Sequence, residues 1–257
     1  MLRKYPRTHH LEGSRLQPGD EDLNQVTFAH LQNRHLVVEE KLDGANTGIS
    51  FTPDGTLQLQ SRGHYLTGGP RERQFGPLKA WATTIQHALH DRIRDRYVVY
   101  GEWLYAKHTV FYDALPHYFC EFDILDQHTD TFLATPERAA LLDGLPIASV
   151  PVLHSGQVPS LKALTAYIGP STCRTPQWKD ALVQAAQGSD QVLSETDLDD
   201  HMEGIYLKVE ADGVVVDRYK WVRPTFLTAI LDAGTHWMDR PIVPNQLANP
   251  AVMYGTL

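Results

Sequence analysis

A lysine followed at fixed spacing by an acid, a glycine and an amide is the part of the chain best suited to chemistry. These residues are Lys41, Asp43, Gly44 and Asn46, in a K-x-D-G-x-N element after an apolar run. A lysine attacks phosphorus only as a free amine, so we expect nearby cations or burial to lower the pKa of Lys41 from about 10.4. Asp43 could hold a hydrated metal ion, Gly44 lets the backbone approach a ligand closely, and Asn46 offers a donor and an acceptor. The element indicates covalent nucleotide transfer, although a polar turn after a strand has the same pattern.

Further short motifs follow this element in a fixed order. They are residues 61–63 (Ser-Arg-Gly), 100–103 (Tyr-Gly-Glu-Trp), 119–123 (Phe-Cys-Glu-Phe-Asp), 203–206 (Glu-Gly-Ile-Tyr) and 218–221 (Arg-Tyr-Lys-Trp). Spaced motifs seldom recur in order by chance. Across residues from about 36 to 223, the series resembles the covalent nucleotidyltransferases, the superfamily of polynucleotide ligases and messenger-RNA capping enzymes.

Two features narrow the resemblance. Asn46 stands where DNA ligases and capping enzymes usually have arginine, and this is most similar to the RNA ligase 2 branch of ATP-dependent RNA ligases. The N-terminal residues 5–8 (Tyr-Pro-Arg-Thr) and 13–15 (Gly-Ser-Arg) resemble bacterial ligases of this branch that work beside polynucleotide kinases. The resemblance therefore implies an enzyme that acts on RNA ends, with a polynucleotide kinase/phosphatase as a candidate partner.

The resemblance also assigns the catalytic groups. Lys41 would attack the α-phosphorus of ATP, expel pyrophosphate and become lysyl-AMP. Lys220 would neutralise the charge that develops on the α-phosphate, with Arg218 on the same strand face. The related enzymes normally have lysine at position 218, and a guanidinium does not give up its proton, so only a charge-stabilising role carries over. Glu203 and Asp43 are the candidates to hold the water shell of Mg²⁺ or Mn²⁺.

The remaining assignments concern the nucleotide. By the same resemblance, Glu102 would bind the ribose hydroxyls and Phe122 would pack near the nucleoside. Arg62 would hold phosphate, and the main chain at Glu40 would read the adenine edge.

Hydrophobic periodicity predicts the elements that position these groups. Residues 36–38 form a strand that leads into Lys41, residues 47–52 and 56–60 form a hairpin, and residues 78–93 form a helix with an apolar stripe. Strands over 97–100 and 118–125 would deliver Glu102 and Asp123 at or near their ends. A second hairpin, 205–209 with 214–221 across an Asp-Gly turn, would bring Glu203 and Lys220 onto neighbouring strands.

Other parts of the chain show no chemical motif. Residues 126–201 are predicted to be mostly helical, with helix starts at Thr135-Pro136, Ser160 and Thr175-Pro176. A final helix is predicted over 224–232, followed by an irregular tail. We therefore expect a nucleotidyltransferase domain over residues 1–225 and a short C-terminal helix and tail over 226–257.

Composition fits a compact intracellular enzyme. The chain has 257 residues, of which 42% are hydrophobic, and it has no stretch resembling a signal peptide or a membrane span. Two cysteines leave no disulfide framework, and we expect a cytoplasmic protein that does not bind membranes. The net charge of −8 is unusual for a nucleic-acid-binding protein, so RNA contact would need a local basic face. Candidates for that face lie in three segments: Arg3, Lys4, Arg7 and Arg15; Arg62, Arg71, Arg73 and Lys79; and Arg92, Arg94 and Arg96.

These observations predict an α+β protein with antiparallel sheets flanked by helices, the nucleotidyltransferase fold without an OB domain. Its predicted activity is ATP-dependent joining of 5′-phosphate and 3′-hydroxyl RNA ends through lysyl-AMP and RNA-adenylate, in RNA repair. Two alternatives stay open. One is another covalent nucleotidyltransferase, such as a capping-type guanylyltransferase or a minimal DNA ligase. The other is an inactive module that binds nucleotide or RNA.

Overall fold

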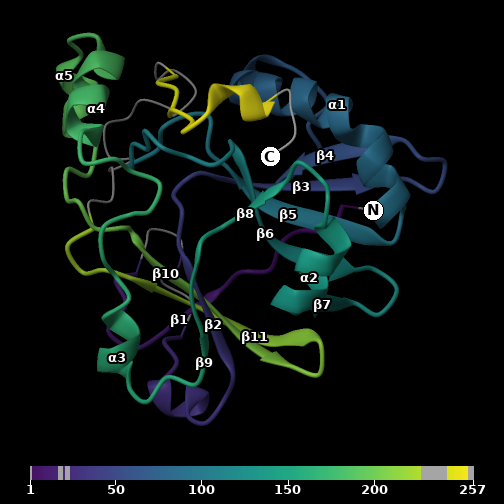
Figure 1. Cartoon of the computed structure of the whole chain (residues 1–257), viewed down its shortest axis with the longest axis horizontal. Coiled ribbons are helices and arrows are strands. Elements are labelled where there is room, and N and C mark those ends of the chain that lie inside the picture. The colour runs from purple at the N-terminus through teal and green to yellow at the C-terminus, as the bar shows by residue number, and fades with distance from the viewer. Residues whose placement is uncertain (1, 17–19, 21–23, 227–241, 254–257) are drawn as a thin grey trace.

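A strongly bent, mostly antiparallel sheet forms the centre of the protein (Figure 1). The structure is a computed structural model that describes residues 2–16, 20, 24–226 and 242–253. Among these residues the main path of the sheet runs β4-β3-β5-β6-β7-β11-β10-β2-β9, while β1 pairs with β11 and β8 pairs with β6. The α+β prediction, with antiparallel pairing and flanking helices, is confirmed.

The elements have the following bounds. The strands are β1 (His9–His10), β2 (Leu36–Glu40), β3 (Ala45–Phe51), β4 (Leu57–Ser61), β5 (Tyr97–Trp103), β6 (Phe119–Asp126), β7 (Thr131–Leu133), β8 (Ala148–Ser149), β9 (Val152–Gly156), β10 (Gly204–Ala211) and β11 (Val214–Val222). The helices are α1 (Gly76–Ile93), α2 (Thr135–Leu142), α3 (Leu161–Thr165), α4 (Trp178–Ala186) and α5 (Asp190–Ser194). Short 3-10 segments cover Phe28–Leu31, Pro70–Phe75 and Pro250–Met253.

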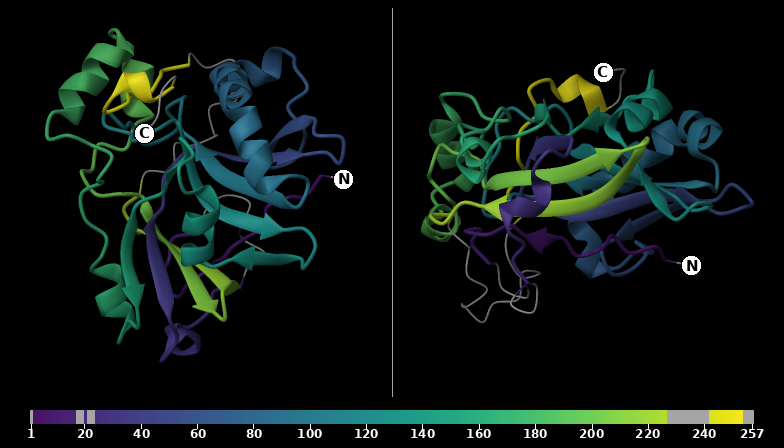
Figure 2. Two further views of the ribbon diagram at one scale, coloured as in Figure 1. Left: turned by 45° about the vertical axis from the view of Figure 1, so that its right-hand side comes forward. Right: turned by 90° about the horizontal axis from the view of Figure 1, so that it is seen from below.

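Strands β3 to β6 form one half of the sheet, with α1 packed across it. The buried face of α1 carries Leu78, Trp81, Ile85 and Leu89, the apolar stripe predicted from the sequence. These side chains join Ile49 and other strand residues in one core. Figure 2 shows α1 beside this half of the sheet, away from the β10–β11 hairpin. The helix therefore supports the strands that carry Asn46 and Glu102.

Strands β2, β9, β10 and β11 form the other half. The β10–β11 hairpin turns at Asp212 and Gly213, whose φ angles of 52° and 77° are those of the predicted tight turn. Its register pairs Tyr206 with Lys220, and Tyr206 also lies opposite Glu39 of β2. Because directly paired residues share a face of a sheet, these three side chains project from the same side.

The region from 126 to 201 is only partly helical, so the prediction for it was wrong in part. It contains β7, β8 and β9, and β9 pairs with β2 at the end of the sheet path. These strands are two to five residues long, too short to show an alternating pattern. Ser160 caps α3 as predicted, but α4 begins at Trp178, three residues after Thr175.

The helix predicted over 224–232 lies mostly outside the described residues. Residues 242–253 pack onto the body of the protein, where the Asn245 side chain is buried and bonds to the backbone of Leu104 and Tyr112. The division at residue 225 stays a prediction. In the described part of the chain, no helix has both the length and the apolar character needed to cross a bilayer.

Candidate active site

A pocket of about 640 Å³ lies between the two halves of the sheet. That volume is typical of a small-molecule or cofactor site. Its lining brings together most of the residues predicted from the sequence: Glu40, Lys41, Asp43, Gly44, Asn46, Arg62, Glu102, Phe122 and Lys220. These residues come from β2, β3, β5, β6 and β11 and from the segments between them, so the bend of the sheet creates the pocket.

Lys41 follows β2 directly and faces Glu203, which precedes β10. The Lys41 Nζ atom lies 2.7 Å from both Glu203 carboxylate oxygens, and the Glu203 side chain is fully buried. Burial lowers the pKa of Lys41, but Glu203, Asp43 and Glu102 outweigh that effect, so its pKa lies above the ordinary value. The lowered pKa expected from the sequence is therefore absent in the ligand-free protein. The physical reason is the direct ion pair with Glu203.

Asp43 and Gly44 shape the backbone beside Lys41. One Asp43 oxygen, Oδ2, accepts hydrogen bonds from the N–H groups of Thr109 and Val110 at 2.7 and 2.9 Å. Both bonds use Oδ2, so they do not prevent the other oxygen, Oδ1, from contacting a water or an ion. A Cβ atom on Gly44 would lie 2.6 Å from the Trp103 carbonyl oxygen, so glycine is needed here for close packing against β5.

Glu102 and Asn46 form a cross-strand pair between β5 and β3. Glu102 accepts a hydrogen bond from the Gly44 N–H at 3.0 Å. Burial, together with Asp43 and Glu203, raises the pKa of Glu102 to about 8 against the opposing effect of Lys41. The strand continues to Trp103, so Glu102 lies one residue from the end of β5, near the end as predicted. A mostly protonated carboxyl in this position can donate a hydrogen bond to a ribose hydroxyl.

Lys220 and Arg218 share one face of β11 but have different neighbours. Lys220 lines the pocket, and burial, followed by the charge of Lys41, lowers its pKa. Arg218 is not among the lining residues: its Nε donates to Asp123 Oδ2 at 3.0 Å, and its guanidinium lies 3.6 Å from the centre of the Phe132 ring. Lys220 therefore lines the pocket, whereas Arg218 contacts Asp123 and Phe132 beside it.

The other predicted nucleotide contacts, Phe122, Glu40 and Arg62, differ in their burial and in their bonding partners. Phe122 is half-buried, with its ring 5.1 Å from that of Tyr5. The Glu40 side chain points away from Lys41 and receives a 2.5 Å hydrogen bond from Ser171, while its N–H donates to the Pro151 carbonyl. A base contact from the Glu40 main chain would therefore have to use the carbonyl. Arg62 is exposed at the rim.

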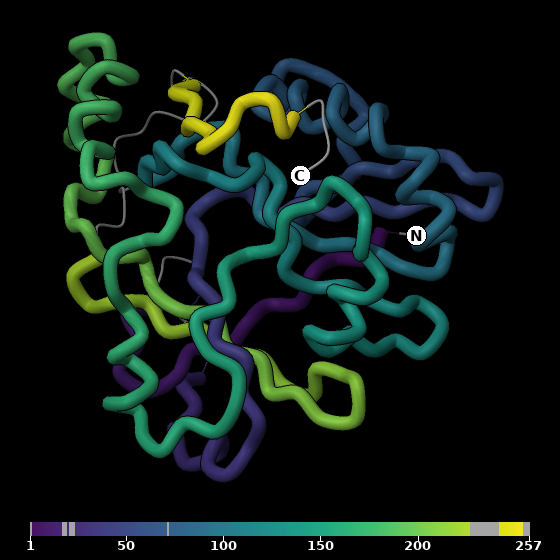
Figure 3. Tube along the Cα trace, viewed as in Figure 1, coloured from purple at the N-terminus to yellow at the C-terminus, as the bar shows by residue number. Residues whose placement is uncertain are grey.

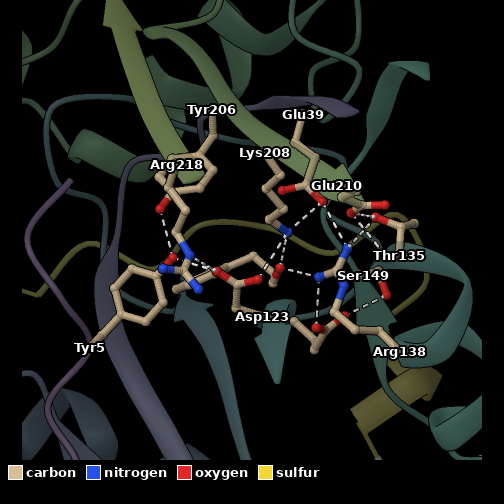
Figure 4. Close-up of polar contacts among 12 residues, drawn as sticks. Tyr5, Glu39, Asp123, Thr135, Arg138, Ser149, Tyr206, Lys208, Glu210 and Arg218 are labelled. Carbon is tan, nitrogen blue, oxygen red and sulfur yellow. Dashed lines mark hydrogen bonds and ion pairs between the residues drawn. The ribbon is translucent and has the colours of Figure 1, made fainter. Parts of the chain in front are cut away.

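A buried network of charges links side chains of β2, β6, β10 and α2 (Figure 4). Lys208, which is fully buried in β10, lies 2.9 Å from Glu39 and 3.5 Å from Asp123. Arg138 of α2 bonds to Glu39 at 2.9 Å and to Glu121 at 2.8 Å. Both cations also donate to the carbonyl of Phe122. The network thus fixes the backbone of the residue predicted to pack on the nucleoside.

The N-terminal segment supplies pocket residues that had no assigned role in the sequence. Tyr5 donates to Asp123 Oδ2 at 2.5 Å, and its oxygen lies 2.6 Å from the Tyr206 hydroxyl, which lies 2.9 Å from Thr8 Oγ1. Tyr5, Thr8 and Tyr206 all line the pocket. Two features of the sequence could have indicated these residues. One is the Tyr-Pro-Arg-Thr segment itself, and the other is the pair Tyr206 and Lys208, which are polar residues at alternate positions of an otherwise apolar strand.

The acidic groups around Lys41 fit a hydrated cation. Glu203 and Asp43 both lie close enough to raise the pKa of Lys41. In the described residues no three His, Cys, Asp or Glu side chains are grouped closely enough to hold a bare metal ion. Mg²⁺ keeps several of its waters and often binds proteins through one or two carboxylates, so Glu203 and Asp43 match that mode.

Comparison with known proteins gives a consistent result. Residues 34–222 match the RNA ligase family. Solved structures of a Naegleria gruberi RNA ligase are similar: one mutant with AMP and manganese (TM-score 0.55, 15% identity) aligns over 86% of this chain and 56% of that chain. A second mutant, with ATP and manganese, has a TM-score of 0.54 and 17% identity over 88% of this chain and 57% of that one.

A Naegleria gruberi RNA ligase with pyrophosphate aligns over 84% of this chain and 59% of its own, at a TM-score of 0.51 and 16% identity. The chain therefore spans little more than half the length of these ligases. No curated protein matches the sequence.

Proposed function

The chain belongs to the RNA ligase family, and from that premise we propose that it is an ATP-dependent RNA ligase, of the RNA ligase 2-like branch and with the nucleotidyltransferase fold. The observation that carries this proposal is the position of Lys41 in the pocket, 2.7 Å from Glu203 and beside Lys220 and Glu102. That set of groups supplies a nucleophile, a charge-stabilising cation and a ribose contact.

The proposed reaction has three steps. The Lys41 amine attacks the α-phosphorus of ATP, a P–N bond forms, the bond to the β-phosphate oxygen breaks, and pyrophosphate leaves. A 5′-phosphate oxygen of RNA then attacks the lysyl-AMP phosphorus, which breaks the P–N bond, returns the amine and forms RNA-adenylate. Finally a 3′-hydroxyl attacks the 5′-phosphate, loses its proton and expels AMP, which leaves the two ends joined.

This chain's residues have separate tasks in the first step. Lys220 would contact the α-phosphate and stabilise its growing negative charge. Glu102 would hold the ribose hydroxyls, and Phe122 would pack against the base. Lys41 must lose a proton before it reacts, and the ion pair with Glu203 opposes that loss. A magnesium or manganese ion held through water by Glu203 and Asp43 would offset the carboxylate charge that keeps the amine protonated.

The chemistry of the RNA ends also indicates which kind of reaction must precede the proposed ligation. The proposed ligase needs a 5′-phosphate and a 3′-hydroxyl, so an end-processing kinase/phosphatase would supply its RNA. The N-terminal Tyr-Pro-Arg-Thr segment, which is similar to that of ligases acting beside such enzymes, supports a role in RNA repair.

Labelling with nucleotide tests the proposal directly. The protein is incubated with Mg²⁺ and α-labelled ATP or GTP and then denatured; we expect a labelled band with ATP only. Sealing of 5′-phosphorylated RNA and DNA ends is then compared, and we expect RNA to be preferred. Labelling by GTP would favour a capping-type enzyme, exclusive DNA sealing a DNA ligase, and no covalent adduct an inactive binding module.

A further inference from the structure

The carboxylate of Asp20, in the N-terminal region, forms an ion pair with Lys220, the lysine that is proposed to bind phosphate. Asp20 Oδ2 accepts a hydrogen bond from Lys220 Nζ and lies 3.1 Å from His10 Nε2. Asp20 Oδ1 lies 3.3 Å from Arg7 Nη2. The Asp20 side chain is only 13% exposed, and that of His10 is fully buried. Three nitrogen donors from two parts of the chain therefore converge on one anion.

Backbone pairing explains why these donors meet. Strand β1 runs parallel to β11, with His10 opposite Lys220. Residues paired in this way project from the same side of the sheet. The segment crosses the molecule from the N-terminal end toward β11 (Figure 3), so that Thr8 and Lys220 both line the pocket. The cluster is thus continuous with the proposed nucleotide site.

The hydrogen bonds of His10 identify it as a donor to the anion. Ser14 Oγ accepts the Val222 N–H at 2.9 Å and lies 2.7 Å from His10 Nδ1. If the Ser14 hydroxyl donates to Nδ1, the proton of the neutral ring resides on Nε2, which faces Asp20. Burial lowers the pKa of His10, in agreement with a neutral ring. His10 can therefore donate to an anion without carrying a charge.

The donor set matches a phosphate group as well as a carboxylate. Lysine, arginine and a fixed imidazole N–H are all suited to a tetrahedral oxyanion, which offers more acceptor oxygens and more charge than a carboxylate. Burial raises the pKa of Asp20, but the hydrogen bonds from Lys220 and His10 outweigh it and bring the pKa to about 2. Asp20 is thus a permanent anion at neutral pH.

We propose that Arg7, His10 and Lys220 form a phosphate-binding site that the Asp20 carboxylate occupies in the nucleotide-free protein. A substrate phosphate must then displace Asp20 to reach Lys220. The inference rests on the proposed function, because it assumes that a phosphorylated substrate enters this pocket. The phosphate could belong to ATP or to the 5′ end of RNA, since the same donors recognise both.

The test removes the internal anion and compares the two substrates. Asp20→Asn keeps the size of the side chain but loses its charge, so the substrate phosphate that competes with it should bind more tightly, by about tenfold for one hydrogen bond between charged groups. The KM for ATP is measured in lysyl-AMP formation, and the KM for 5′-phosphorylated RNA in transfer from preformed lysyl-AMP. A fall for ATP alone assigns the site to the nucleotide, and a fall for RNA alone to the RNA end.

Asp130→Asn is the matched control, because Asp130 pairs with Arg3 of the same N-terminal segment at the exposed surface. It should leave both KM values unchanged. Arg7→Ala provides a second test that does not depend on Asp20→Asn folding well, since Arg7 is 41% exposed. Arg7→Ala should raise the same KM that Asp20→Asn lowers. His10→Gln can still place an N–H near the position of Nε2, so it should raise that KM less than His10→Ala does.

Two results would overturn the inference. If Asp20→Asn leaves both KM values unchanged, or raises them together with those of Arg7→Ala, Asp20 serves only to position Lys220. These results differ from failure of the proposed function, in which the wild-type protein itself would form no lysyl-AMP.

Discussion

The ion pair between Lys41 and Glu203 holds the proposed nucleophile in its charged form. The two groups meet at 2.7 Å, and the carboxylate is fully buried. A charged amine has no lone pair for attack on phosphorus, so this ion pair holds the lysine in an unreactive form. In the proposed reaction, the bound substrates and cation would activate the lysine by changing the charge around Glu203.

Lys41→Ala should abolish lysyl-AMP formation but still allow sealing of RNA that already carries a 5′-AMP group. The lysine acts only before that intermediate exists. Gel assays with labelled ATP and with pre-adenylated RNA measure the two activities separately. Lys179→Ala, at a lysine that is 53% exposed and outside the pocket, is the control. Retained ATP labelling in the Lys41 variant would refute the assignment.

Glu203→Gln should lower the rate of lysyl-AMP formation by about a hundredfold, the scale typical of losing a charge-stabilising group. The amide is the same size but cannot supply the charge that holds a hydrated cation. Single-turnover rates over a range of Mg²⁺ concentrations provide the measurement. Glu210→Gln is a matched control within β10, the strand that follows Glu203, because Glu210 bonds to Thr135 outside the pocket. Normal rates in folded Glu203→Gln protein would make this acid structural only.

At the scale of elements, β11 carries one side chain for the site and one for the fold. Lys220 and Arg218 lie two residues apart on one face, but only Lys220 lines the pocket. Lys220→Ala should nearly eliminate lysyl-AMP formation while changing the free energy of unfolding little. Arg218→Ala should instead destabilise the fold by about 3–5 kcal/mol, because it leaves the buried Asp123 carboxylate without one of its partners.

Urea unfolding and adenylation assays on both variants separate these roles. Arg218→Lys tests whether positive charge alone is sufficient, and it should keep much of the adenylation activity. An active Lys220→Ala enzyme would show that β11 does not supply the phosphate contact.

Gly204 sets the spacing of β10 and β11 at the end of the hairpin nearest the site. A Cβ atom there would lie 2.1 Å from the Trp221 carbonyl oxygen, so Gly204→Ala must push the strands apart. We expect a loss of about 1–3 kcal/mol in stability together with reduced adenylation, since Glu203 and Lys220 sit at this junction. Gly169→Ala, where a Cβ would meet nothing within 4 Å, is the control. Equal thermal stability of the two variants would contradict the packing argument.

The long periodic elements were predictable, and the short ones were not. Both hairpins and helix α1 follow from alternation, turn residues and an apolar stripe, and they bring Lys41, Glu102 and Lys220 to one pocket. The sequence gives no local signal for β9 or for the Tyr5–Asp123 bond, because each depends on a partner more than 100 residues away. The sequence predicts a lowered pKa for Lys41, whereas the structure shows a raised one. The cause is again a residue distant in the sequence, Glu203.

At the scale of the whole molecule, a buried histidine makes the stability of the fold depend on pH. His117 is fully buried against Trp81, and its Nδ1 accepts the Phe119 N–H at 2.9 Å. Burial lowers the pKa of His117 to about 4. The unfolded chain therefore takes up a proton near pH 6.5 while the folded protein does not, and stability falls as the pH drops from 6.5 toward 4.

His117→Asn tests this link, because the amide oxygen can replace Nδ1 as an acceptor but cannot titrate. Between pH 7.5 and 5 the wild-type protein should lose about 2 kcal/mol more unfolding free energy than the variant. Urea unfolding at the two pH values gives the difference. Parallel losses in both proteins would show that other groups govern the acid response.

Lys41 and Glu203 are in contact in the folded protein but far apart in the sequence, and this has a consequence during synthesis of the chain. The two residues are 162 positions apart, and the Tyr206 and Lys220 walls of the pocket are synthesised later still. At about 5–20 residues per second, a ribosome adds Glu203 roughly 8–30 seconds after Lys41. During that interval the nascent chain carries its reactive lysine without the partner that holds it or the pocket that would bring it a nucleotide. The proposed site is therefore complete only late in translation, when the β10–β11 hairpin closes the sheet.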